Sequence, residues 1–165
     1  MIAAKNLVIG YGNSLRCDDG VGVRVAEMVA DWHLPKVRSL AVTQLTPELA
    51  QDLAGVDSII FVDACQAVDT DTVEVCALKP LATTQLHSHF GDPRALLSLT
   101  LAIYGKCPQA WWVIIPATNF QLGESLSSLA KKGIALALIQ IRAILNGNCQ
   151  TMTTATDIKY NSCTK

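Results

Sequence analysis

The sequence has little charge, and neither sign prevails. Of its 165 residues 16% are charged, and 13 Lys and Arg stand against 14 Asp and Glu, which gives a net charge of −1. Proteins that bind nucleic acid or anionic membranes through electrostatics carry a basic surface patch. We therefore expect neither a nucleic-acid partner nor a membrane partner.

Long apolar runs are absent too. No uninterrupted apolar stretch approaches the roughly 18 residues that a membrane-spanning helix needs. Residues 1–6 lead directly into a short apolar run, without the longer apolar region and the cleavage site of a signal peptide. The sequence thus predicts a cytoplasmic protein with no membrane span.

The cysteines lack the spacing of a metal cluster. The six are Cys17, Cys65, Cys76, Cys107, Cys149 and Cys163. None forms a C-x-x-C pair, which argues against a zinc site or a thioredoxin-type motif. An even count allows disulfides, but 50% hydrophobic residues suffice for a core that needs none. We expect a reducing compartment, and we interpret Cys17 and Cys65 as small buried side chains rather than as ligands or nucleophiles.

Hydrophobic periodicity alternates between strand-like and helix-like segments. Residues 59–62 are all apolar, which predicts a strand that is buried on both faces and ends at Asp63. Val21, Val25 and Met28 fall on one helical face. Such patterns predict strands at 6–9, 37–42, 58–62, 72–78 and 110–115, and helices at 18–32, 46–55, 92–104 and 124–145. The alternation predicts an α/β fold, a three-layer αβα sandwich with a mainly parallel twisted sheet of about five strands.

The length is that of one domain, which we place at residues 1–146 and expect to be monomeric. After Leu145 the composition turns to Thr, Asn and Ser and shows no period. Residues 147–165 are therefore predicted to be a flexible, Thr-rich tail.

Acidic residues follow two of the predicted strands, at the sheet edge where such folds bind ligands. One Asp of the pair Asp18–Asp19 is enough to cap the start of a helix, and a second adjacent carboxylate repels the first unless it is solvated or bound to a cation. Asp63 follows an apolar strand, where it either caps a turn or has a functional role. Asp19 and Asp63 are therefore candidate site residues.

Two of the three histidines, His87 and His89, lie in a polar loop before a predicted helix. A single loop histidine is usually just solvated, but imidazole is also a common ligand of late divalent metals. Two carboxylates and one imidazole near one sheet edge could bind such a metal and leave coordination positions open. Residues 10–13, with the sequence GYGN, lack the third glycine and the lysine of nucleotide-binding loops, so they predict a tight turn.

The residues resemble those of the hydrogenase maturation proteases. Residues 6–22, NLVIGYGNSLRCDDGVG, are similar to the opening motif of that family, a strand ending in G-x-G-N followed by L-x-x-D-[DE]-G-x-G. Residues 60–64, IFVDA, resemble the second motif, and Ser88–His89 before an apolar helix resembles the third. The strand at 112–116 and the downstream Gly123 fit as well. The resemblance extends over residues 6–145.

The resemblance implies an endopeptidase that removes the C-terminal extension of a nickel–iron hydrogenase large-subunit precursor after nickel insertion. The implied ligands of nickel, which the substrate carries, are Asp19, Asp63 and His89. The first ligand is Glu in several members and Asp here. Residues 43–49, TQLTPEL, replace a glycine-rich segment and look more like the enzymes of bidirectional, NAD(P)-linked hydrogenases.

Several chemical readings remain open at this point. Nickel could polarise the scissile carbonyl or a water as a Lewis acid. Alternatively, Asp19 or Asp63 could act as general base for water, as in an aspartyl protease. No Ser–His–Asp or Cys–His arrangement is apparent in the sequence, which disfavours an acyl-enzyme. The rival classes are a non-proteolytic nickel-binding assembly chaperone of hydrogenase and a small-molecule hydrolase with a carboxylate-held metal.

Overall fold

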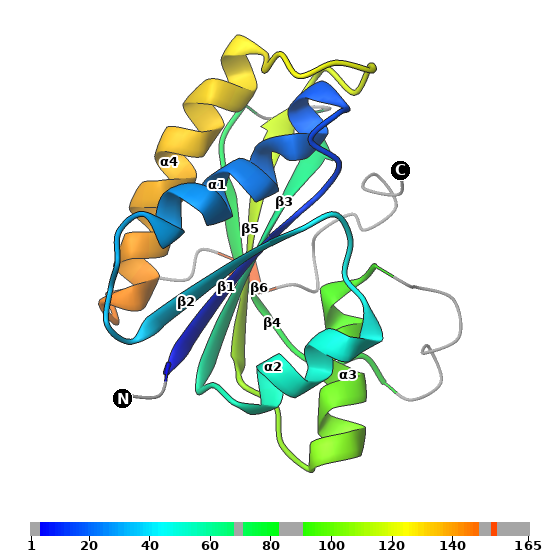
Figure 1. Cartoon of the computed structure of the whole chain (residues 1–165), viewed down its shortest axis with the longest axis vertical. Helices are drawn as coiled ribbons and strands as arrows, with labels where there is room; N and C mark the ends of the chain where they lie inside the picture. Colours follow the sequence, from blue (N-terminus) through cyan, green and yellow to red (C-terminus); the bar gives the residue numbers. More distant parts are fainter. Residues whose placement is uncertain (1–3, 68–70, 83–90, 149–152, 155–165) are drawn as a thin grey trace.

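A six-stranded sheet is the centre of the protein in a computed structural model that describes residues 4–67, 71–82, 91–148 and 153–154. The strands are β1 (Asn6–Tyr11), β2 (Val37–Val42), β3 (Ser58–Gln66), β4 (Glu74–Leu78), β5 (Gln109–Ala117) and β6 (Thr153–Thr154). Their order is β2-β1-β3-β5-β4-β6 (Figure 1). The first three and β5 run parallel, and β4 is antiparallel to β5.

Helices cover both faces of this sheet. They are the 3-10 turns η1 (Cys17–Gly20) and η2 (Pro47–Leu49) and the α-helices α1 (Val21–Ala30), α2 (Ala50–Ala54), α3 (Pro93–Tyr104) and α4 (Ser128–Leu145). On one face, α1 and α4 pack against Ile60 and Val62 of β3. On the other face, α2 and α3 pack against Ile59 and Phe61. The predicted three-layer αβα sandwich with a mainly parallel sheet is confirmed.

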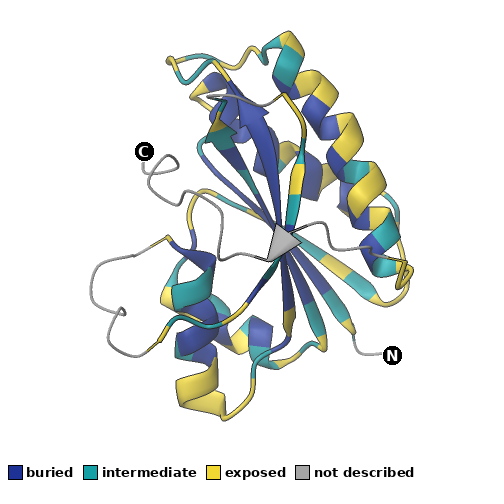
Figure 2. Cartoon of the chain, turned by 180° about the vertical axis from the view of Figure 1, so that it is seen from behind, coloured by how far each residue is buried: buried dark blue, intermediate teal, exposed yellow. Residues whose placement is uncertain are grey.

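Burial follows this layering. Residues 59–62 of β3 are fully buried because both of their faces are covered, as the apolar run predicts. In Figure 2 the buried residues concentrate in the middle strands and on the helix sides that face them. Two hydrophobic cores therefore hold the sheet between its helices, and the polar functional residues are confined to its edges.

Three strands continue past the residues where the sequence predicts their ends, and the first is β1, which includes Gly10 and Tyr11. β3 does not stop at Asp63, because residues 63–66 still pair with residues 114–117 of β5. A backbone ladder needs no apolar side chain, so periodicity alone cannot show its end. β5 includes Pro116, beyond the last residue of β5 that β4 pairs with, Ile114. There β5 has a strand partner on one side only, which tolerates the missing N–H of proline.

Two helices begin later than predicted. The segment predicted as a helix from Asp18 starts as the 3-10 turn η1 and becomes α-helical only at Val21. The last helix begins at Ser128 rather than Glu124. Its N-cap is Ser127, which has an extended backbone and accepts a hydrogen bond of 3.1 Å at Oγ from the N–H of Ala130.

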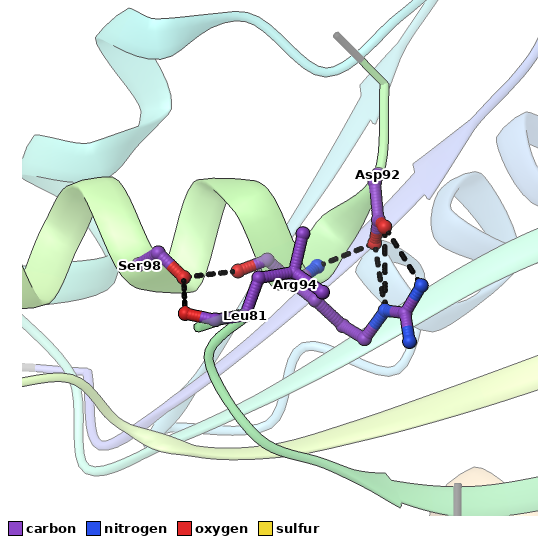
Figure 3. Close-up of polar contacts among 4 residues, drawn as sticks. All are labelled: Leu81, Asp92, Arg94 and Ser98. Carbon is purple, nitrogen blue, oxygen red and sulfur yellow. Dashed lines mark hydrogen bonds and ion pairs between the residues drawn. The ribbon is translucent and has the colours of Figure 1, made fainter. Parts of the chain in front are cut away.

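The first two turns of α3 anchor the chain on either side of residues 83–90. Asp92 is the N-cap of α3: its carboxylate accepts a hydrogen bond of 2.8 Å from the backbone N–H of Arg94 and pairs with the Arg94 guanidinium at 3.0 Å (Figure 3). Ser98 donates a hydrogen bond of 3.0 Å to the carbonyl of Leu81, which precedes the segment. Leu81 and Asp92 are thus both fixed to the same helix.

Part of the predicted tail contributes to the sheet. Thr153 and Thr154 form β6, which pairs in parallel with Cys76 and Ala77 of β4. The rest of residues 149–165 lies outside the described residues. Among the helices that the structure describes, none has the length and apolar character required to cross a membrane.

Candidate active site

The carboxyl ends of β1, β3 and β5 lie at one edge of the sheet, next to η1 and the start of α1 (Figure 1). In open parallel sheets this edge is the usual ligand-binding position. The loop after β1 contains the acidic pair, β3 contributes Asp63, and residues 118–127 follow β5. The two acidic segments that the sequence predicts for this edge, the loop after β1 and the residues at Asp63, are therefore brought there. The loop that follows β4 leaves the sheet at the opposite edge, because β4 is antiparallel to β5 and its last residue, Leu78, pairs with Ala110.

Close backbone packing sets the position of η1 relative to the sheet. A Cβ atom on Gly10 would lie 1.7 Å from the carbonyl oxygen of Gly22, and one on Gly22 would lie 2.5 Å from that of Val62. Only glycine leaves room for the start of α1 to lie directly on β1 and β3. The glycines of the opening motif thus allow helix and sheet to pack closely. This role agrees with the sequence pattern, which argues against a nucleotide-binding loop at these residues.

Asp19 is buried within η1, with 4% of its surface exposed. Its Oδ2 accepts a hydrogen bond of 2.9 Å from the backbone N–H of Asn13. The side chain of Asn13 in turn accepts a hydrogen bond of 2.9 Å from the N–H of Leu15, which holds the turn after β1. A buried carboxylate with a fixed direction is suited to bind a cation or a proton.

Asp63 lies on β3 and is partly buried. Its burial raises the pKa of the carboxyl group to about 7, against the opposing effect of hydrogen bonds from the N–H of Ala64 and the hydroxyl of Tyr11. The bond from Ala64 reaches Oδ1 and is 2.8 Å long. Near neutral pH this carboxyl group can therefore take up and release a proton, which is the property of a general base.

Asp18 has a different environment from its neighbour. It is completely buried, and its carboxylate accepts hydrogen bonds from the N–H groups of Thr118 (3.0 Å), Asn119 (3.0 Å) and Ser127 (2.7 Å) and from the hydroxyl of Ser127 (2.7 Å). Burial alone would raise the pKa of Asp18, but these hydrogen bonds lower it below its ordinary value. Asp18 is therefore a structural anion that links η1 to the segment after β5.

The structure places the predicted metal ligands unequally. Asp19 and Asp63 come to the same sheet edge, where η1 contacts β3. His89, like His87, lies outside the described residues. Within the described ranges no group of three or more His, Cys, Asp or Glu is placed to hold a metal ion. The ligand set Asp19, Asp63 and His89 thus stays a prediction.

The cysteines near the site differ from one another. Cys17 is a buried free thiol whose sulfur lies 3.7 Å from the hydroxyl of Ser125. Cys65 is disulfide-bonded. The sequence predicts no disulfide, and this prediction is wrong at Cys65. A large hydrophobic core removes the need for a stabilising disulfide, but it does not prevent a disulfide from forming beside the site.

Sequence reasoning missed two residues of the site. Tyr11 ends β1 and reaches Asp63 on the neighbouring strand, and Ser127 reaches Asp18 across 109 positions of sequence. The position of Tyr11 at the end of a strand beside the one that carries Asp63 could have indicated the first contact. The contact between Ser127 and Asp18 could not have been predicted, because the local pattern around Ser127 indicates only an N-cap.

Several solved structures with this fold are named as hydrogenase maturation endopeptidases or proteases. HybD from E. coli superposes with a TM-score of 0.69 and 24% identity, covering 87% of this chain and 93% of the other. HycI from Thermococcus kodakarensis gives 0.68 and 24% over the same shares. A further endopeptidase from Escherichia coli gives 0.67 and 27%, again over 87% and 93%. No protein-family model and no curated protein matches the sequence. The chain has the fold of the hydrogenase maturation endopeptidases.

Proposed function

We propose that this protein is an endopeptidase that removes the C-terminal extension of a nickel–iron hydrogenase large-subunit precursor after nickel insertion. The observation that carries the proposal is the position of Asp19 and Asp63, two shielded acidic residues at the carboxyl edge of the endopeptidase fold. Their place agrees with the motifs that resemble this family in the sequence. The precursor is the proposed partner of a monomeric, cytoplasmic enzyme.

In this proposal Asp19, Asp63 and His89 bind the nickel that the substrate carries. Burial makes the charged form of Asp63 costly, as its raised pKa of about 7 indicates. A divalent cation beside this carboxylate would offset that cost. Carboxylate oxygen and imidazole nitrogen are also suitable ligands for late divalent metals. Cleavage would then depend on correct metal loading of the precursor.

Asp63 is our candidate for the general base. In the free protein its pKa is about 7, and the substrate's nickel would lower that value, so that the ionised carboxylate can accept a proton from water at neutral pH. The substrate's nickel would supply Lewis acidity next to it. The sequence shows no Ser–His–Asp or Cys–His arrangement, so we favour direct attack by water over an acyl-enzyme.

The proposal is tested with purified large-subunit precursors of several hydrogenase classes, with and without nickel, including a bidirectional NAD(P)-linked enzyme. Mass spectrometry should find loss of a C-terminal peptide only from nickel-loaded precursor. Asp19→Asn and Asp63→Asn should abolish the loss. Asp57→Asn is the matched control, because Asp57 is exposed and precedes the opposite end of β3. Stable association of every nickel-loaded precursor without shortening would instead indicate an assembly chaperone.

A further inference from the structure

Asp18 is a buried charge that the proposed chemistry does not use. It is 0% exposed, and its two carboxylate oxygens accept four hydrogen bonds. Three donors are backbone N–H groups and the fourth is the hydroxyl of Ser127. All four belong to residues 118–127, the segment between β5 and α4, and none belongs to the turn that carries Asp18 itself. A residue that only capped its own helix would accept hydrogen bonds from the first turn of that helix, and not from a distant segment.

The backbone next to Asp18 is bound to the same segment. The N–H of Cys17 donates to the carbonyl of Gly123 at 2.7 Å, and the N–H of Asp18 donates to that of Asn119 at 2.9 Å. Gly123 also donates to the carbonyl of Leu15 at 2.8 Å. Residues 15–18 therefore lie against residues 119–123 through both main chain and side chain, and Asp19 is the next residue along.

The carboxylate of Asp19 accepts a hydrogen bond at Oδ2 from the N–H of Asn13, at 2.9 Å. Its backbone N–H donates to the carbonyl of Arg16 at 3.1 Å within the same turn. The direction of the Asp19 carboxylate thus depends on the position of the turn 16–19. The most deeply buried group that holds this turn in place is the carboxylate of Asp18.

We propose that Asp18 is a positioning residue for Asp19. By binding the donors of residues 118–127, Asp18 fixes η1 so that the carboxylate of Asp19 keeps its direction toward the metal of the substrate. This inference rests on the proposed function, because it takes Asp19 to be a ligand of the substrate's nickel. It gives the segment after β5 a part in the site, although that segment supplies no ligand.

The chemistry requires a carboxylate at this position. Oδ2 accepts from Thr118, Asn119 and the Ser127 hydroxyl, while Oδ1 accepts from the Ser127 N–H. An asparagine has one acceptor oxygen, and its NH₂ group would face at least one N–H donor. Asp18→Asn therefore preserves the shape of the side chain but loses part of the attachment. Ser127→Ala removes the hydroxyl bond to Asp18 and, with it, the N-cap bond from Ala130 to the same oxygen, which weakens the start of α4.

The test follows the Asn13 amide by NMR hydrogen exchange, because this amide reports the direction of the Asp19 carboxylate directly. Asp18→Asn should speed its exchange by about tenfold or more, and should lower kcat/KM for cleavage of the nickel-loaded precursor by a similar factor. Ser127→Ala should change both quantities in the same direction by less. The control is Ile141→Ala, which weakens α4 through its fully buried face and touches none of these bonds.

A purely structural role makes the opposite prediction. In that case Asp18→Asn and Ile141→Ala, compared at equal loss of stability, would give the same Asn13 exchange and the same cleavage, and the proposal would be overturned. If Asp18→Asn does not fold, Ser127→Ala decides by the same comparison. If the wild-type protein cleaves no precursor, the proposed function fails, whereas the exchange measurement still decides whether Asp18 holds Asp19 in place.

Discussion

Gly22 lies so close to β3 that a Cβ atom there would be 2.5 Å from the carbonyl oxygen of Val62. Gly22→Ala should therefore force the start of α1 away from the sheet. We expect a loss of unfolding free energy of about 2–3 kcal/mol, in the range of overpacked cores, and a displaced η1. Urea denaturation measures the first effect. Gly55→Ala is the control, because its Cβ would be 3.5 Å from the nearest backbone oxygen, that of Asp52, which is an ordinary contact. Equal stability of both variants would contradict the packing argument.

Asp63 should make the folded protein less stable as pH rises. Its folded-state pKa of about 7 lies above the ordinary value of 3.8, because its burial favours the protonated form. The folded state therefore binds more protons than the unfolded chain between these values, and stability is lost as pH rises through that window. At pH 8 Asp63→Asn should be more stable than wild type, by an amount on the order of 3 kcal/mol.

The comparison is made by urea denaturation at pH 8 and at pH 4, with wild type measured beside the variant each time. The advantage of Asp63→Asn should shrink at pH 4, where the folded wild type is protonated at this residue and the unfolded chain is close to half-protonated, since its pKa is 3.8. Asp57→Asn serves again as the exposed control, just before the start of the same strand. A variant that is less stable than wild type at pH 8 would show that the charged form of Asp63 is favoured in the fold.

Asp18 should have the opposite pH dependence. Its hydrogen bonds from Ser127, Thr118 and Asn119 overcome the effect of burial and lower its pKa. Such a group contributes stability above its unfolded pKa, and the contribution is lost as pH falls through the folded pKa. Asp18→Asn should thus cost about 2–3 kcal/mol at pH 7, as for hydrogen bonds to a charged group. The cost should decrease toward pH 3. A constant cost between the two pH values would refute the charge argument.

The sequence predicts the layers and the edge of the site well, because these follow from local patterns. The apolar run 59–62 is buried on both faces, and Asp63 stands at the edge that the parallel-sheet rule indicates. The different roles of Asp18 and Asp19 were not separable, since adjacent identical residues have the same local pattern. Their distinction depends on hydrogen bonds to Thr118 and Ser127, about a hundred positions away, which no periodicity encodes.

Cys76 should be unreactive toward alkylating agents in the folded protein. Burial, reinforced by the negative charge of Glu74 and opposed by Arg94, raises the pKa of its thiol to about 12. The thiolate is the nucleophile, so almost none forms at pH 8. Iodoacetamide followed by peptide mass spectrometry should find Cys107, which is only partly buried, modified well before Cys76. Modification of both at the same rate in native protein would show that β4 opens far more readily than its pairing with β5 suggests.

Tyr11→Phe should shift the titration of Asp63. The Tyr11 hydroxyl bonds to the Asp63 carboxylate and lowers its pKa, so its removal should raise that pKa above about 7. If Asp63 is the general base, the acidic limb of the pH profile of kcat/KM for precursor cleavage, which reports the free enzyme, should move to higher pH by the same amount. Tyr104→Phe is the matched control, since Tyr104 is exposed at the end of α3. Carboxyl NMR titration of Asp63 measures the shift without any substrate. A raised pKa with an unmoved cleavage profile would assign the base to another residue, and an unchanged pKa would disprove the Tyr11 contact itself.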